Sequence, residues 1–393
     1  MLDFNFLNPV KIIFGKGKIA RLSKEILRKH KILMVYGGGS IKRNGVYQQV
    51  REALIEHQIV EFPGVESNPK YETLVKGIEL VRKEKIDFIL AVGGGSVIDG
   101  SKFIAAGAFY DKDPWDIVSK HAKIQKALPL GTVLTLPATG SEMNANSVIS
   151  RRDSQEKLAF HSVHIFPQFS ILDPSVTFSL PSEQIANGVV DAFVHVMEQY
   201  LTYPVNAPLQ DRMAEAILIT LMEEGPKALL SPQDYDTRAN IMWSATMALN
   251  HLIGVGVPSD WSTHTMSHEL TASCGLDHAR SLAIIFPSLV YFQRKEKRAK
   301  ILQYAERVLR LPFPSISSDG DQDKMDSIVE LAIERTRQFF EGMGIKTRLR
   351  DYAINESAIP SLLEKLEGHG MVKLGERGSI TLDTCKQILE RSL

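Results

Sequence analysis

Hydrophobic residues in the first half of the chain alternate between short β-branched runs and segments with helical spacing. The apolar runs occupy residues 31–36, 87–92 and 133–136, and each is followed by glycines or small polar residues. Helical patterns lie among them at about residues 42–56, 71–84 and 98–108. Because strands that alternate with helices usually form a parallel sheet covered on both faces, we predict an α/β domain over residues 1–180.

After Pro181 the pattern changes, because β-branched runs become scarce and long amphipathic segments follow one another. The spacing predicts helices over residues 182–201, 210–229, 235–250, 262–273 and 294–309. Residues 312–326 are rich in serine, aspartate, proline and glycine, which predicts an exposed loop. We therefore expect a second, all-helical domain over residues 181–393.

Composition and charge favour a cytoplasmic enzyme. Basic and acidic residues both number 46, so the chain lacks the basic excess of a nucleic-acid-binding protein. Cys274 and Cys385 are the two cysteines, too few for a disulfide framework, and a reducing compartment fits them best. The first residues do not resemble a signal peptide, and the longest apolar stretch, residues 282–292, is too short to span a bilayer.

Candidate metal ligands gather in the helical half. Asp191 and His195 are four residues apart, which places them on one helical face, and His264 and His268 repeat this spacing. His278 follows ten residues after His268, beyond an expected helix end at Gly275. A carboxylate and neutral imidazoles suit a divalent ion such as Zn²⁺ or Fe²⁺.

The alternative for any one histidine is a packing or capping role, and two helical pairs beside a further histidine weigh against it. His268 stays open to three interpretations: a metal ligand, a partner of a ligand, or a proton donor.

Glycine-rich turns after the predicted strands are candidate cofactor loops. Residues 93–99 (GGGSVID) lie between a strand and a helix, where backbone N–H groups can approach a pyrophosphate, and Ser96 can cap the helix. We assign Asp99 to the same cofactor-binding set. Residues 139–142 (TGSE) follow the next strand and, with Asn144 and Asn146, suit a second lip of the site. The alternatives are a tight turn without a ligand and a polar surface loop.

The earlier turn, Gly37, Gly38, Gly39 and Ser40, bears on the choice of nucleotide. An acidic residue at such a strand end commonly binds the ribose hydroxyls of NAD and repels a 2′-phosphate. This stretch has no carboxylate and is followed by Lys42 and Arg43. The pattern therefore favours NADP, the alternative being a turn whose basic residues face solvent.

Together these motifs resemble the iron-containing (group III) alcohol dehydrogenase family, and in particular its NADP-dependent branch of aldehyde reductases and butanol dehydrogenases. The stretches that carry the resemblance are residues 91–99 (AVGGGSVID), 139–142 (TGSE), 191–198 (DAFVHVME) and 264–268 (HTMSH) followed by His278. The resemblance covers essentially the whole chain. It implies a Rossmann-like dinucleotide-binding domain followed by a helical domain, the fold shared with dehydroquinate synthases, and it suggests a homodimer.

The resemblance also implies roles for single residues. The family's metal ligands fall on Asp191, His195, His264 and His278, and His268 matches a histidine that lines the site without binding the metal. Gly94, Gly95 and Ser96 match the pyrophosphate loop, and Thr135, Thr139 and Asn146 match other cofactor contacts. Lys157 matches a lysine near the ribose, and Asn68 matches an asparagine on the adenosine side. Members that use NAD tend to have aspartate at the position of Gly37, so its absence points to NADP. The family name does not decide between iron and zinc.

The implied reaction is hydride transfer between NADP(H) and a small aldehyde or primary alcohol, with the metal as Lewis acid and His268 as a proton relay. The dehydroquinate synthases, whose fold is similar, instead catalyse elimination and ring closure, and they need several lysine and arginine side chains to bind an anionic substrate. Residues 252–263 and 271–275, expected near the metal, are instead apolar and neutral, which favours a small uncharged substrate. A nucleotide-binding regulator without chemistry is disfavoured, because it would not require the ligand set.

Overall fold

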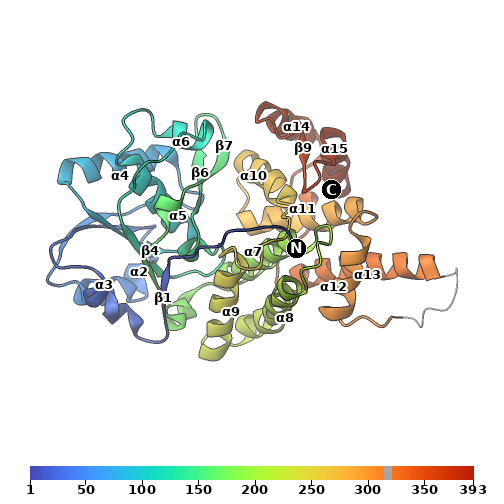
Figure 1. The fold of residues 1–393 in the computed structure, drawn as a ribbon, viewed down its shortest axis with the longest axis horizontal. Coiled ribbons are helices and arrows are strands. Elements are labelled where there is room, and N and C mark those ends of the chain that lie inside the picture. Colours follow the sequence, from blue (N-terminus) through green and yellow to red (C-terminus); the bar gives the residue numbers. More distant parts are fainter. Residues whose placement is uncertain (314–320) are drawn as a thin grey trace. The chain divides into compact units, whose positions relative to one another are not determined.

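The computed structural model describes residues 1–313 and 321–393, and in it the chain forms two compact units (Figure 1). The α/β unit comprises Leu7–Pro181 and Ser231–Asn250. The helical unit comprises Met1–Phe6, Ser182–Leu230 and His251–Leu393. The change at Pro181 thus coincides with a boundary between units, whereas residues 231–250 return to the α/β unit.

The α/β unit is built on a six-stranded parallel sheet with the strand order β1-β8-β5-β4-β2-β3. Its strands, in chain order, are β1 (Lys11–Phe14), β2 (Lys31–Tyr36), β3 (Gln58–Phe62), β4 (Phe88–Gly93), β5 (Leu130–Leu134) and β8 (Phe169–Leu172). The predicted parallel sheet is confirmed. Continuous apolar runs form its centre because both faces of these strands are buried.

Helices cover both faces of this sheet, and alternate residues of β2 show how. Leu33 and Val35 belong to one buried cluster with α5, whereas Ile32 and Met34 belong to another with α3. The helices of the unit are α1 (Leu22–Glu25), α2 (Ser40–Arg43), α3 (Val46–Ala53), α4 (Tyr71–Glu84), α5 (Gly95–Gly107), α6 (Trp115–Ser119) and α9 (Tyr235–Ala248). The single helix predicted over residues 42–56 is divided at Gly45, whose φ of 81° interrupts it.

An antiparallel hairpin was missed by the sequence patterns. It consists of β6 (Asn146–Arg151) and β7 (Glu156–His161) and pairs Ser150 with Lys157. Its first strand packs on α5. The hairpin therefore places Asn146 and Lys157, two predicted cofactor contacts, beside the helix that follows the glycine loop.

The helical unit contains a small sheet as well as helices. Its helices are α7 (Ser182–Tyr200), α8 (Pro208–Leu230), α10 (Ser262–Cys274), α11 (His278–Gln293), α12 (Arg298–Arg307), α13 (Asp321–Gly342), α14 (Ile359–Gly368) and α15 (Leu382–Arg391). Strands β9 (Lys373–Leu374) and β10 (Ile380–Thr381) form a short antiparallel ladder, so the prediction of an all-helical domain was wrong in this detail.

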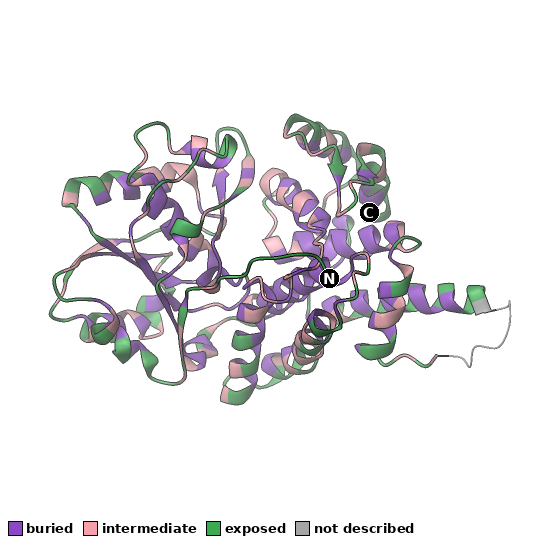
Figure 2. Ribbon diagram, viewed as in Figure 1, coloured by how far each residue is buried: buried purple, intermediate pink, exposed green. Residues whose placement is uncertain are grey.

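One further expectation is corrected here, and one helix was not predicted. A loop was predicted over residues 312–326, but helix α13 already starts at Asp321. Residues 314–320 lie outside the described part of the chain. The apolar stretch at residues 282–292 is part of α11, whose middle is buried (Figure 2). A helix that is apolar all round shows no amphipathic period, which is why the pattern did not identify it.

Within the described residues, no helix has both the length and the apolar character needed to cross a membrane.

Candidate metal centre and cofactor loops

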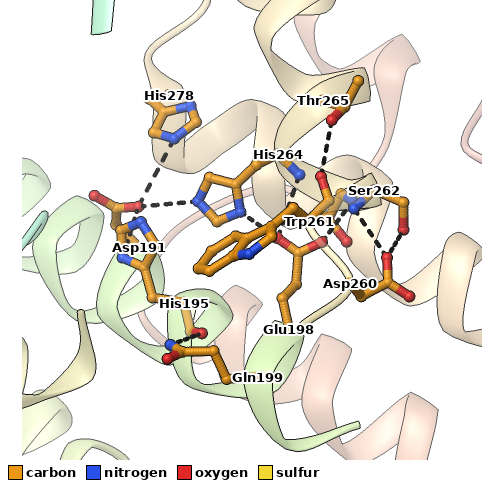
Figure 3. A network of polar contacts seen from close by, with 11 residues as sticks. Asp191, His195, Glu198, Gln199, Asp260, Trp261, Ser262, His264, Thr265 and His278 are labelled. Carbon is orange, nitrogen blue, oxygen red and sulfur yellow. Dashed lines mark hydrogen bonds and ion pairs between the residues drawn. The ribbon is translucent and has the colours of Figure 1, made fainter. Parts of the chain in front are cut away.

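Helix α7 contributes two candidate ligands from one of its faces. Asp191 and His195 are one turn apart, both are buried, and His195 Nδ1 lies 3.6 Å from Asp191 Oδ1. The predicted i, i+4 pair is therefore brought together, and Figure 3 shows both side chains turned toward α10.

Two further histidines approach the same carboxylate oxygen from α10 and α11. His264 Nε2 lies 4.0 Å from Asp191 Oδ1, and His278 Nε2 lies 3.9 Å from it (Figure 3). Gly275 ends α10 in the left-handed conformation, with φ of 69°, so the chain reverses and starts α11 at His278. The four predicted ligands thus converge from three helices.

The spacing of these side chains fits a divalent ion. Ligand atoms of Asp191, His195 and His264 all lie within 4.8 Å of one another. An ion bound at about 2.1 Å in tetrahedral geometry separates its donor atoms by about 3.4 Å, so small side-chain movements complete the site. One carboxylate and neutral imidazoles, without thiolate, suit zinc or iron.

His268 lies beside this group without joining it. Its ring centroid is 5.2 Å from that of His278 and 6.3 Å from that of His264, and the residue is half-buried. The structure therefore places His268 near two of the predicted ligands. Its role as a proton relay stays a prediction.

Glu198 is a buried carboxylate for which the sequence patterns predicted no role. It accepts a hydrogen bond from the backbone N–H of Thr263 at 2.6 Å and makes a short contact with His264 Nδ1. Burial raises the pKa of Glu198 to about 8, and the negative charge of Asp260 adds to the rise. A cation at the neighbouring ligands would oppose this effect. Glu198 lies three residues after His195 and seven after Asp191, on the same helical face. This spacing is the signal that could have identified Glu198.

The expectation of a neutral lining over residues 252–263 was wrong, because Asp260 lies in this segment and is buried. Its carboxylate pairs closely with Lys297, whose ammonium group is also 3.2 Å from Glu376. Burial and a hydrogen bond with Asp260 raise the pKa of Glu376 to about 7. The charge at Asp260 is therefore neutralised within the protein.

The predicted cofactor loops meet at one edge of the parallel sheet. Tyr36 at the end of β2 pairs with Val92, and Gly93 at the end of β4 pairs with Leu134. From β2 the chain continues outward to β3, whereas β4 lies on the other side of β2. Ligands of open α/β sheets bind at such a switch point, outside the carboxyl ends of the strands.

Helix α5 starts in the glycine loop and presents its first N–H groups there. Gly94 is the N-cap, and Gly95 and Ser96 are the first two helical residues. A Cβ atom built on Gly95 would lie 2.6 Å from Thr139 Cγ2, so the two loops are in close contact. The Ser96 hydroxyl accepts from the N–H of Asn68 at 3.3 Å, and the N–H of Thr135 donates to the Gly93 carbonyl at 3.0 Å. The structure therefore brings these predicted contacts together.

Asp99 lies inside the lip and holds it. Its carboxylate accepts from the Ser141 hydroxyl at 2.5 Å and from the N–H of Val148 at 3.0 Å. Burial raises the pKa of Asp99, whereas the charges of Lys102 and Lys157 act against the rise. The assignment of Asp99 to the cofactor stays a prediction, and within the protein its carboxylate supports the lip.

Lys102 is a buried cation that the sequence patterns missed. Its ammonium group donates to Ser141 Oγ at 2.8 Å, to Asn144 Oδ1 at 3.1 Å and to the carbonyl of Asn146 at 2.8 Å. Burial lowers the pKa of Lys102 to about 8. Three acceptors on residues 141–146 mean that this one side chain fixes the second lip.

A carboxylate from another strand reaches the Gly37–Ser40 turn. Glu61 of β3 accepts hydrogen bonds from the hydroxyls of Tyr36 at 2.7 Å and Tyr47 at 2.6 Å, and Lys42 Nζ lies 4.0 Å from it. Burial raises the pKa of Glu61, but these hydrogen bonds outweigh it and the pKa ends below its ordinary value. The turn itself has no carboxylate, as the sequence shows. The fold nevertheless brings Glu61 close to it, with its oxygens already hydrogen-bonded to the two tyrosine hydroxyls.

Comparison with known families places the whole chain in one class of oxidoreductase. The family described as iron-containing alcohol dehydrogenase matches residues 9–174, and the C-terminal part of the Fe-containing alcohol dehydrogenase family matches residues 185–393. The chain belongs to the iron-containing alcohol dehydrogenase family. The resemblance inferred from the motifs and the predicted fold class are both confirmed.

Individual relatives match over nearly their full length. The NADPH-dependent aldehyde reductase YqhD of Escherichia coli is 55% identical over 99% of both chains. The probable NADH-dependent butanol dehydrogenase 1 of Bacillus subtilis is 42% identical over 100% of both. The crystal structure of the E. coli K-12 protein YqhD superposes with a TM-score of 0.96 and 53% identity, covering 100% of this chain and 99% of that one.

Proposed function

We propose that this protein is a metal-dependent oxidoreductase that transfers hydride between NADP(H) and small aldehydes or primary alcohols. The observation that carries the proposal is the convergence of Asp191, His195, His264 and His278 on one point, in a chain of this family. Four such donors suit zinc or iron, and elemental analysis decides between the two metals.

A divalent ion held there polarises a carbonyl group as a Lewis acid. The surrounding residues supply the rest of the chemistry. Asp191 gives the ligand set one negative charge, and the imidazoles act as neutral donors. His268 stands beside His278 and is suited to pass a proton between solvent and the alcohol oxygen of the substrate. Lys297 neutralises Asp260, which leaves an uncharged aldehyde as the suitable substrate class.

NADP(H) is the proposed cofactor, bound at the carboxyl edge of the parallel sheet. The N–H groups of Gly95 and Ser96 at the start of α5, with Gly94, suit the pyrophosphate. We assign Lys157 to the ribose, Asn68 to the adenosine side, and Thr135, Thr139 and Asn146 to further cofactor contacts. We assign Gly37, Gly38 and Ser40 to the adenosine ribose. A Cβ atom on Gly38 would have no neighbour within 4 Å, whereas one on Gly37 would lie 3.2 Å from the carbonyl oxygen of Val65. One relative is named NADPH-dependent and another NADH-dependent, so the preference is measured directly.

We also propose that the enzyme is a cytoplasmic homodimer. Strand β1 lies at an edge of the sheet with Phe14 exposed, and Trp243 packs against that ring and is itself exposed. An exposed strand edge with apolar side chains favours coverage by a second copy. Light scattering coupled to size exclusion measures the mass in solution.

The central experiment combines metal analysis with steady-state kinetics. Purified protein is assayed with butanal and either NADPH or NADH, beside His264→Ala, Asp191→Asn and the control His30→Gln, a histidine in the other unit. We expect both ligand variants to lose metal and turnover together while the control keeps both. Turnover that survives after the metal is lost would contradict the proposed mechanism.

A further inference from the structure

The start of helix α10 is capped by residues outside the helix. Its N-cap is Trp261, which has φ of 60° and makes no side-chain capping bond. The first N–H groups of a helix have no partner within it and need acceptors. Asp260 accepts from the N–H of Ser262 at 2.9 Å, and Glu198 of α7 accepts from those of Thr263 at 2.6 Å and His264 at 3.3 Å. The carboxylate of Glu198 thus caps α10 from a different helix.

The same carboxylate also contacts the ring of His264. Glu198 Oε2 lies within hydrogen-bonding distance of both the backbone N–H and Nδ1 of this one residue (Figure 3). Because Nδ1 then donates to a carboxylate, the lone pair of His264 is on Nε2, the atom that faces Asp191. One buried group therefore sets both the backbone position and the tautomer of a proposed metal ligand.

The neighbours of Glu198 hold it in this position. It shares one face of α7 with Asp191 and His195, so a single helix carries two ligands and the support for a third. The N–H of Asp260 donates to the Glu198 carbonyl at 2.8 Å, which ties the segment before α10 to α7. The Trp261 ring also packs edge-on against His264, with the two ring centroids 5.4 Å apart.

We infer that Glu198 is a positioning residue that sets the metal affinity of the site through His264. The inference rests on the proposed function, since it assigns His264 to the metal. Partners that orient a ligating histidine typically change metal affinity about 10- to 100-fold when they are removed. Glu198 combines this orienting contact with the helix cap, so its removal affects metal binding as well as stability.

The chain offers a matched control for a test. Glu269 of α10 is buried like Glu198 and accepts from His369 Nδ1 at 2.7 Å, and His369 is not among the proposed ligands. Glu198→Gln and Glu269→Gln each remove the charge of a buried carboxylate–histidine pair. Metal is removed from the wild type and both variants. The melting temperature of each metal-free protein is measured, and separate samples are titrated with Co²⁺ while the visible absorption spectrum of the bound ion is recorded.

We expect Glu198→Gln to raise the dissociation constant for Co²⁺ at least about tenfold and to change the spectrum. Glu269→Gln should keep the wild-type constant and spectrum, even where both variants melt at similarly lowered temperatures. Glu198→Asp, which keeps the charge but is one methylene shorter, should also weaken binding and serves if the glutamine variant does not fold. Wild-type affinity and spectrum in the Glu198 variants would overturn the inference. A wild type that binds no Co²⁺ would refute the metal centre itself.

Discussion

Replacing Gly95 with alanine tests the nucleotide loop through one neighbour, Thr139. The new Cβ atom would lie 2.6 Å from Thr139 Cγ2, closer still to Oγ1, and 3.1 Å from its Cβ. Because the Cβ of Thr139 is itself in the way, rotation of that side chain relieves only part of the overlap. Thr139 Oγ1 also accepts from the N–H of Ser141 at 3.2 Å, so its displacement extends to the second lip.

The size of the effect follows from two opposing terms. Overpacking of this kind costs about 1–3 kcal/mol, whereas alanine in place of glycine in a helix returns up to about 1 kcal/mol. We expect a net loss of about 1 kcal/mol in the free energy of unfolding. A shift of the loop that weakens NADPH binding by a similar amount, about 1.4 kcal/mol, corresponds to a tenfold higher dissociation constant.

Denaturant unfolding and NADPH fluorescence titrations measure these two quantities for Gly95→Ala, Thr139→Ala and the double variant. Thr139→Ala removes Cγ2 and Oγ1, so the double variant should recover at least about 0.5 kcal/mol of stability relative to the sum of the single changes. Gly342→Ala is the control, because its Cβ would meet nothing within 4 Å. Additive stabilities, or unchanged NADPH affinity in Gly95→Ala, would show that the contact with Thr139 does not shape the loop.

Three further outcomes follow from buried charges and from the ribose turn. Lys102→Met should lower the free energy of unfolding by about 3–5 kcal/mol in denaturant melts, because it leaves buried carboxylates without their cation, whereas the exposed Lys227→Met should cost less than about 1 kcal/mol. The pKa of Glu376 is raised from 4.5 to about 7, so as pH rises between these values the unfolded state releases the proton before the folded state does. The free energy of unfolding of the wild type should therefore fall by about 1–3 kcal/mol relative to that of Glu376→Gln between pH 4.5 and 7. Parallel pH profiles of the two proteins would contradict this. Gly37→Asp should lower the ratio of kcat/KM for NADPH over NADH at least about tenfold, and an unchanged ratio would mean that the turn does not select the nucleotide.

Much of the α/β fold was readable from the sequence because its signals are local. The apolar run at residues 31–36 forms β2 and the amphipathic segment at residues 71–84 forms α4, both within the predicted limits. The return of α9 to the α/β unit was not readable. It depends on Arg238 donating to the Thr177 carbonyl and Thr246 donating to Glu142, contacts between residues 61 and 104 positions apart. Hydrophobic periodicity contains no information on such pairs.

The candidate site divides in the same way. Asp191 and His195 were found because one helical turn separates them, and the structure brings His264 and His278 to them through the reversal at Gly275. The carboxylates that support these groups were missed, because each acts on a partner from another element. Glu198 serves α10 from α7, and Glu61 reaches the turn after β2 from β3.

A buried lysine beside two carboxylates recurs in both units, and stability alone does not account for it. Lys102 interacts with Asp99 and Glu142, and Lys297 pairs with Asp260 and with Glu376. Well-packed apolar residues often match or exceed the stability of a buried ion pair, so such pairs are weak evidence for stabilisation. What apolar residues cannot do is fix polar backbone in one arrangement. Lys102 does this for the lip of the nucleotide loops and, through Asp260, Lys297 does it for the start of α10. Apolar replacement of either whole triad should therefore preserve folding and impair cofactor or metal binding, the opposite of what a purely structural role requires.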